Sequence, residues 1–151
     1  MLPVGQSGAS TQQTTFQVTA NVQVSCQITA TDLDFGTYDK HESKATDAQT
    51  NIQVDCTKGA NWNLGLDKGL HGEDVEHRAM ANDTDGVLLD YGIFQDPAHT
   101  LNWGDTVGVD TVSGTGTGVV QEIETHAEIY KKQTHVTAGG YSDTITATLT
   151  F

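Results

Sequence analysis

The chain has little of three things: basic residues, proline and long apolar runs. Its 151 residues contain 7 Lys and Arg against 20 Asp and Glu, for a formal net charge of −13. Contacts to phosphates need clustered Lys and Arg, so this charge argues against a nucleic-acid partner. No stretch is long and apolar enough to span a bilayer, so we expect a protein that is not membrane-embedded.

A secretory signal is also missing, because the first ten residues, MLPVGQSGAS, have no basic region followed by an apolar one. Either the chain acts in the cytosol, or a signal has been removed from a secreted precursor. Cys26 and Cys56 bear on this choice. Both share the apolar phase of a predicted strand, an arrangement that suits a disulfide and hence an oxidising compartment. Two buried free thiols in a cytosolic β-domain are the alternative.

What the sequence does have is alternation at its start. Every second position between Phe16 and Ile28 is apolar or small, which predicts a strand with one buried face. At about 3.3 Å per residue this strand would run roughly 40 Å, although strands usually have about 3–10 residues. No Gly, Pro or turn pair interrupts it. We therefore expect its first half to leave its own domain.

The same alternation recurs down the chain, and no segment has a convincing helical period. The turn-rich pieces between the strands favour an all-β antiparallel sandwich in a single domain. Segments 39–49 and 68–86 are expected to be loops, the second with a frayed hairpin as its alternative. The further predicted strands are 51–56, 61–66, 87–94, 119–130 and 141–151.

The predicted last strand runs to Phe151, the final residue, so its edge would be bare. Natural proteins normally block such an edge because it invites aggregation. One arrangement would explain both the overlong first strand and the bare edge of the last strand. In it, the first half of the long strand pairs beside the last strand of a neighbouring subunit. Donor and acceptor surfaces differ, so this contact is head-to-tail and builds a chain of subunits.

Several sequence pieces, in this order, resemble the spore-coat-protein-U-like domain. They are CQITATDLDFGTY, IQVDCTKGANWNLGLDKG, LLDYGIFQD, NWGD, GTGTG and AGGYSDTITATLTF, within residues 20–151. That domain forms the pilins of archaic chaperone–usher fimbriae of Gram-negative bacteria. The resemblance implies an incomplete immunoglobulin-like antiparallel sandwich, completed by a donor strand from a neighbouring subunit.

Carried over to this chain, the resemblance divides it into a donor extension, residues 1–21, and a pilin domain, residues 22–151. The donor side chains would be Phe16, Val18 and Ala20, and Val4 would extend the donor. Cys26 and Cys56 match the family's disulfide pair. The predicted acceptor groove consists of Val22, Val24, Ile28, Ile145, Ala147, Leu149 and Phe151.

The function implied is that of a shaft subunit, without cofactor, in a surface pilus used for adhesion and biofilm formation. Its partners would be identical subunits, a periplasmic chaperone, an outer-membrane usher and a tip adhesin. The site of action would be extracellular, reached through the periplasm. The alternative is a secreted monomeric module that binds carbohydrate or another surface, with its first twenty residues folded back onto its own last strand.

Other candidate sites are weaker. His71, Glu73, Asp74, Glu76 and His77 lie in one run, but their spacing fits no known metal site, so we expect a solvated acidic loop.

Asp83, Asp85 and Gly86 begin like a calcium loop, yet Val87 and Phe94 stand where ligands are needed, so an Asx-rich turn is expected. No serine lies in a nucleophile context, and we predict no enzymatic activity. The alternation places Trp62 in the core, whereas Trp103, in a turn, is expected at the surface.

Overall fold

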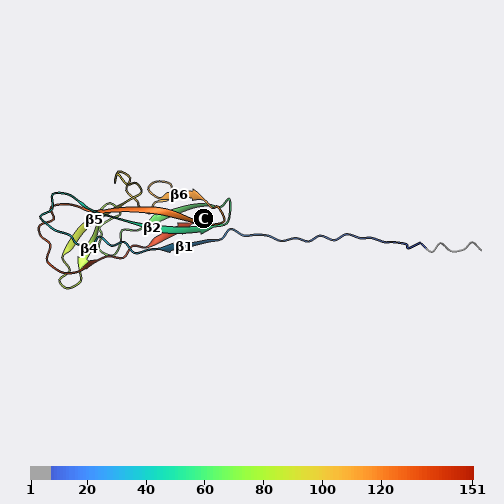
Figure 1. Ribbon diagram of the computed structural model, residues 1–151, viewed down its shortest axis with the longest axis horizontal. Helices are drawn as coiled ribbons and strands as arrows, with labels where there is room; N and C mark the ends of the chain where they lie inside the picture. Colours follow the sequence, from blue (N-terminus) through green and yellow to red (C-terminus); the bar gives the residue numbers. More distant parts are fainter. Residues whose placement is uncertain (1–7) are drawn as a thin grey trace, which may run out of the picture.

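The computed structural model describes residues 8–151, which form two antiparallel β-sheets and a long N-terminal tail (Figure 1). A six-stranded sheet has the order β1-β2-β7-β5-β4-β8, and a three-stranded sheet has the order β6-β3-β9. There is no helix in this part of the chain, and hence none that could cross a membrane. The strands are β1 Cys26–Ala30, β2 Thr46–Cys56, β3 Asn61–Leu66, β4 Arg78–Asn82, β5 Leu88–Phe94, β6 Val112–Thr115, β7 Val120–Ile129, β8 Tyr141–Ser142 and β9 Ala147–Thr150.

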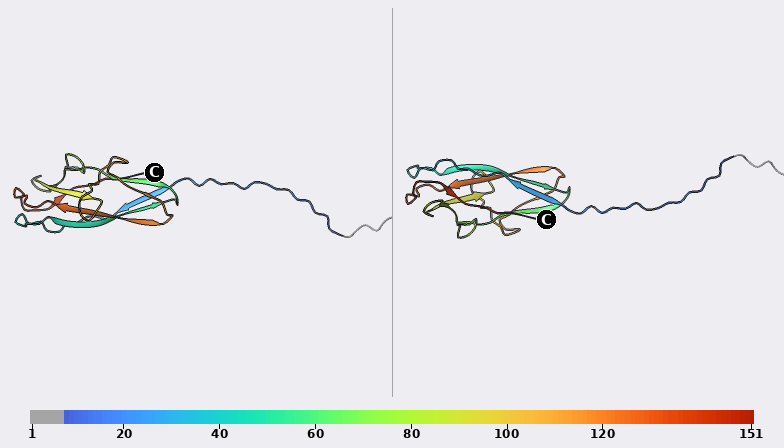
Figure 2. Two further views of the ribbon diagram at one scale, coloured as in Figure 1. Left: turned by 90° about the horizontal axis from the view of Figure 1, so that it is seen from above. Right: turned by 90° about the horizontal axis from the view of Figure 1, so that it is seen from below.

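The two sheets face one another, and their inward side chains form one core (Figure 2). Strand alternation supplies this core, as the sequence predicts. On β2, Ile52, Val54 and Cys56 are buried, and on β3, Trp62 and Leu64 are buried. The fold is therefore the all-β sandwich that was expected, with Trp62 inside it.

Two segments predicted to be loops contain strands. β2 begins at Thr46, so the predicted loop 39–49 is too long. Segment 68–86 contains β4, which pairs with β5, so the hairpin given as its alternative is nearer to the structure than the loop. Polar composition misled the prediction in both places. The first half of β2 alternates between partly buried small residues and exposed polar ones, while β4 buries a charged residue, Arg78.

The predicted continuous strand 141–151 is divided between the two sheets. β8 pairs with β4 in the six-stranded sheet, and β9 pairs with β3 in the three-stranded sheet. Residues 143–146 make the crossing, and Asp67 fixes its far end. The carboxylate of Asp67 accepts the Thr146 amide at 2.9 Å, and its own amide donates to the Thr146 carbonyl at 3.1 Å.

Residues 8–24 leave the domain in an extended conformation and run away from both sheets (Figure 1). It emerges at the end of the sandwich where the chain also terminates, in all three views (Figures 1 and 2). Residues 8–24 are exposed throughout and belong to no strand. The hydrogen-bonded domain starts with Ser25, whose amide donates to the Thr57 hydroxyl at 2.9 Å.

Candidate functional site: a groove that opens onto the core

A groove of about 590 Å³ lies between the segment that follows β1 and the segment that leads into β9. Its floor is the hydrophobic core, because Ile52, Leu66, Tyr91 and Ile93 line it while being no more than 5% exposed. An opening that reaches so deep marks a sandwich with one side left uncovered. The walls are residues 30–35 on one side and residues 141–145 and 147 on the other, with Thr50, Met80 and Thr125 completing the lining.

The two strands that continue these walls are both at sheet edges. Among residues 8–151, β1 pairs only with β2, and β9 pairs only with β3. Each strand thus leaves one row of backbone amides and carbonyls without a strand partner, which is the template that an added strand uses. The groove offers an added strand both backbone partners at its edges and apolar surface at its floor.

One polar group is built into the groove wall. Asp143 has the inward phase of its segment, and its carboxylate accepts the Tyr91 hydroxyl at 2.5 Å and the Leu70 amide at 2.8 Å. Burial, and then the hydrogen bond to Asp143, raise the pKa of Tyr91 well above its usual range. Tyr91 is therefore a neutral donor at all physiological pH values, and it holds the crossing segment against the six-stranded sheet.

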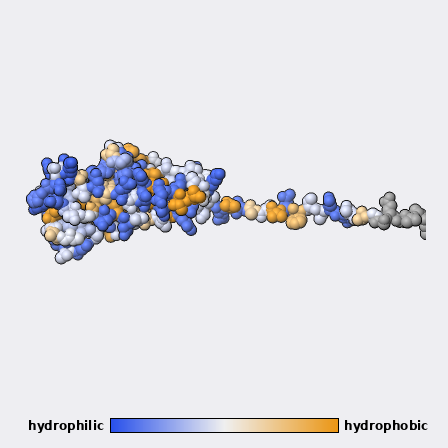
Figure 3. Space-filling model, viewed as in Figure 1, coloured by the Kyte–Doolittle hydropathy of each residue, from blue (hydrophilic) through white to orange (hydrophobic). Residues whose placement is uncertain are grey.

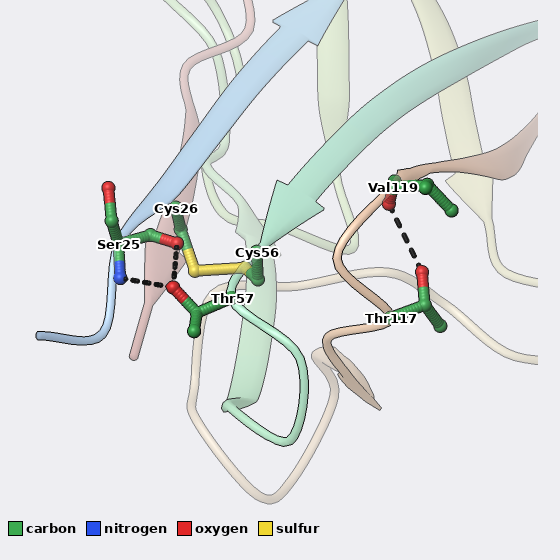
Figure 4. The surroundings of a disulfide bond; sticks show 6 residues. All are labelled: Ser25, Cys26, Cys56, Thr57, Thr117 and Val119. Atoms are coloured by element: carbon green, nitrogen blue, oxygen red, sulfur yellow. Dashed lines mark hydrogen bonds between the residues drawn. A yellow bond between two sulfur atoms is a disulfide. The ribbon is translucent and has the colours of Figure 1, made fainter. Parts of the chain in front are cut away.

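A disulfide joins Cys26 to Cys56 where the tail enters the domain (Figure 4). The two cysteines are directly opposite one another on β1 and β2. Next to them the Thr57 hydroxyl donates to the Ser25 carbonyl at 3.2 Å and accepts the Ser25 amide. This end of β1 is consequently fixed, and the covalent link holds one edge of the sandwich in place. No free cysteine exists in the described chain, which settles the choice between disulfide and free thiols.

The predicted groove residues occupy different places. Ile145 and Ala147 line the groove, and Ile28 and Leu149 pack, partly buried, against the core. Val22, Val24 and Phe151 are more than half exposed and lie outside the lining. The groove is thus displaced along β1 toward its far end, where Leu33 and Phe35 supply apolar surface. The short apolar piece around Leu33 and Phe35 was the signal in the sequence.

The predicted donor residues all project from the tail. Phe16 is 84% exposed and Val18 is 86% exposed, and Ala20 is exposed as well. Apolar side chains recur along the tail between polar ones in the space-filling view (Figure 3). Val4, the suggested extension of the donor, lies outside the described residues.

In an exposed loop, Nδ1 of His77 and the Asp74 carboxylate form a hydrogen bond of 2.7 Å, and this bond raises the pKa of His77. The Asx-rich turn is confirmed, because the Asn82 side chain accepts the Thr84 amide and Asp85 accepts the Val87 amide.

The prediction that Trp103 lies at the surface is wrong. Trp103 is completely buried, and its indole nitrogen donates to the Leu64 carbonyl at 2.8 Å. A turn flanked by polar residues suggested exposure, but the connection after β5 folds inward and carries the indole into the core.

Comparison with known proteins identifies the family. Residues 12–148 match the family model of the Spore Coat Protein U domain. The chain belongs to this family. The chain is also similar to Protein U of Myxococcus xanthus, which is 29% identical over 157 aligned residues, covering 95% of this chain and 87% of that protein.

The Spore Coat Protein U fold also matches a solved structure. This is the CsuC–CsuE chaperone–tip adhesion subunit pre-assembly complex from the archaic chaperone–usher Csu pili of Acinetobacter baumannii, with a TM-score of 0.66 and 25% identity. The match covers 86% of this chain but only 40% of the matched chain, so this protein spans less than half of that relative.

Proposed function

We propose that this protein is a shaft subunit of an archaic chaperone–usher pilus and polymerises by donor-strand exchange. One observation carries the proposal: the groove opens onto the core between two unpaired strand edges, in a chain that also carries an exposed apolar tail. The tail of one subunit fills the groove of the next. Phe16, Val18 and Ala20 are the donor side chains in this proposal, and residues 1–21 are the extension.

The direction of the tail fits a head-to-tail chain. The tail leaves the domain at the end toward which β9 runs, since the C-terminus lies there (Figure 1). Consider a neighbouring subunit that has the same orientation and lies farther along this tail. The tail inserted there runs antiparallel to β9 of the neighbour and parallel to its β1. Antiparallel pairing beside β9 gives the inserted strand well-aligned hydrogen bonds.

The tail cannot reach the groove of its own domain in its present course. It continues straight into β1, and it would have to reverse before β1 to lie beside it. Between Phe16 and Ile28 there is no Gly or Pro to make such a turn. The extended tail therefore favours exchange between subunits over the monomeric binding module.

Apolar burial and backbone pairing supply the energy of each joint. Burying one Phe or Val side chain that is now in water contributes roughly 1.5–3 kcal/mol. The core of the acceptor is completed by the same event, so leaving the groove amounts to partial unfolding of the acceptor. We expect slow dissociation on this ground.

The remaining partners follow from the solved relative, a chaperone bound to a tip adhesion subunit of archaic chaperone–usher pili. We propose that a periplasmic chaperone covers the groove until an outer-membrane usher exchanges it for the next tail, and that a tip adhesin ends the fibre. The Cys26–Cys56 disulfide suits this route through an oxidising compartment. Surface attachment and biofilm formation are the functions proposed for the fibre.

The test is electrophoresis in SDS, with and without boiling, of the protein sheared from cells that express its chaperone and usher. We expect a ladder of multiples without boiling, and a single band near 16.1 kDa after boiling. Deletion of residues 1–21 should leave only the monomer band. A monomer band alone from the complete chain, with chaperone and usher present, would overturn the proposal.

A further inference from the structure

The outer face of the six-stranded sheet carries two carboxylates in direct opposition. Asp47 on β2 and Glu128 on β7 are cross-strand partners, and both side chains point away from the core. Like charges directly opposite one another on antiparallel strands are destabilising. Within residues 8–151 no Lys or Arg lies within 4.0 Å of either carboxylate.

The group that faces both carboxylates is the imidazole of His99. Its Nδ1 lies 3.2 Å from Oε2 of Glu128 and 4.0 Å from Oδ1 of Asp47. Oxygen and nitrogen atoms of all three side chains fall within 4.8 Å of one another. The three residues come from β2, β7 and the connection after β5, so the fold brings them together from distant parts of the sequence.

The imidazole is held in place by its surroundings. It stacks on the ring of Phe94 with 5.0 Å between ring centres and 25° between planes. The Asp96 carboxylate accepts the amides of Thr100 and Leu101 and so closes the turn that presents His99. His99 and Glu128 are largely buried, whereas the side chain of Asp47 is 67% exposed and free to adjust.

We propose that Asp47, His99 and Glu128 bind a divalent transition-metal ion of the zinc type. Imidazole nitrogen and carboxylate oxygen are ligands that such ions accept. Zinc bonds of 2.0–2.2 Å in a tetrahedron place neighbouring ligand atoms about 3.4 Å apart. The His99–Glu128 separation of 3.2 Å is close to this value, and the exposed Asp47 carboxylate lies 4.0 Å from His99. Solvent beside Asp47 supplies the fourth ligand.

The bound ion would join the two strands to the connection after β5. The site is separate from the groove, because Asp47 and Glu128 have the outward phase while the groove lining of the same sheet has the inward phase. The inference does not depend on the proposed pilus function, and its test works on fibres or on single subunits.

The experiment is calorimetric titration of the purified, chelator-treated full chain with ZnCl2. We expect one site per subunit, an affinity at least tenfold weaker for Asp47→Asn, and no site for His99→Asn. Asn tolerates the left-handed backbone of His99, whose φ is 57°. The matched control is His77→Asn, which breaks the exposed His77–Asp74 pair and should leave the affinity unchanged.

A second measurement covers the case in which His99→Asn fails to fold. Cobalt(II) added to the unaltered chain should give visible absorption bands of a four-coordinate ion, and Asp47→Asn, an exposed change, should weaken them. Saturating Zn²⁺ should also raise the Tm by several degrees in the unaltered chain and by less in Asp47→Asn. A flat titration, as expected if the His99–Glu128 hydrogen bond is the site's whole role, would overturn the proposal. So would an affinity that is the same in Asp47→Asn.

Discussion

The Tyr91 hydroxyl donates a 2.5 Å hydrogen bond to the Asp143 carboxylate across the floor of the groove. Tyr91 belongs to β5 of the six-stranded sheet, and Asp143 begins the crossing by which the chain enters the three-stranded sheet. The bond therefore ties one wall of the groove to its floor. The Asp143 carboxylate accepts two hydrogen bonds, from the Tyr91 hydroxyl and from the Leu70 amide, so without the first it would keep only the second.

This bond predicts a loss of stability at alkaline pH. Burial and Asp143 raise the pKa of Tyr91 above its unfolded value of about 10. A raised pKa stabilises the protonated folded state, so its contribution is complete below about pH 10 and falls as pH rises toward the folded pKa. Urea unfolding at pH 8 and pH 11 should show a smaller drop in unfolding free energy for Tyr91→Phe than for the unaltered chain.

At pH 8 itself, Tyr91→Phe should lower the unfolding free energy by about 1 kcal/mol, the usual value of one hydrogen bond. Tyr130→Phe is the control, because the pKa of Tyr130 is also raised by burial but its hydroxyl does not bond to Asp143. An equal drop with pH in the unaltered chain and in Tyr91→Phe would contradict the role given to this bond.

Arg78 predicts a large loss of stability on truncation. Its fully buried guanidinium donates to the carbonyls of Leu66 at 2.9 Å, Asp67 at 2.8 Å and Trp103 at 2.6 Å. Arg78→Met would leave these three carbonyls without that donor, so we expect a loss of about 2–4 kcal/mol in urea unfolding. Lys68→Met, at an exposed position, is the matched control and should change stability by less than about 0.5 kcal/mol.

The disulfide predicts a stability difference between oxidised and reduced protein. Cys26 and Cys56 are 30 residues apart, and a loop of that length stabilises the folded state by about 3–4 kcal/mol in the chain-entropy model. The double change Cys26→Ser and Cys56→Ser should show this loss in urea unfolding. Dithiothreitol should produce the same loss in the unaltered chain and none in the double variant, and equal stability of all samples would contradict it.

The donor assignment predicts an effect that depends on side-chain phase. Val18→Asp should abolish the boiling-sensitive ladder, because a carboxylate would have to enter an apolar groove without a partner. Thr19→Asp places the same charge on the next residue, on the other face of the extended tail, and should leave the ladder intact. Equal ladders from the two variants would show that Val18 does not insert.

The small donor residue predicts an effect on rate. Ala20 stands among larger apolar residues, and we expect it to mark a shallow pocket where exchange begins. Ala20→Trp should slow the replacement of chaperone by a donor subunit in a purified exchange assay, whereas Asn21→Trp should not. Unchanged kinetics for Ala20→Trp would refute the shallow pocket.

Sequence alone determined the strands whose alternation is strong. The runs around Ile52, Leu64 and Ile123 each alternate, the run around Tyr91 is apolar on both faces, and each is a strand in the structure. Alternation also placed Trp62 in the core and put Cys26 and Cys56 on one face. The resemblance of several sequence pieces predicted the family, and the match over residues 12–148 confirms it. These features are local, because a period of two records only that one face is buried.

Tertiary structure decided which partner each strand has. The segment from Tyr141 to Thr150 alternates without a break, yet it changes sheets at Asp143 because hydrogen bonds from Tyr91 and to Asp67 hold the crossing. The inward course of Trp103 likewise depends on a bond to Leu64, 39 residues away. The place of the groove, and the meeting of Asp47, His99 and Glu128, arise from pairing between distant segments. A pattern of side chains along one strand cannot record that pairing, because every antiparallel partner satisfies the same alternation.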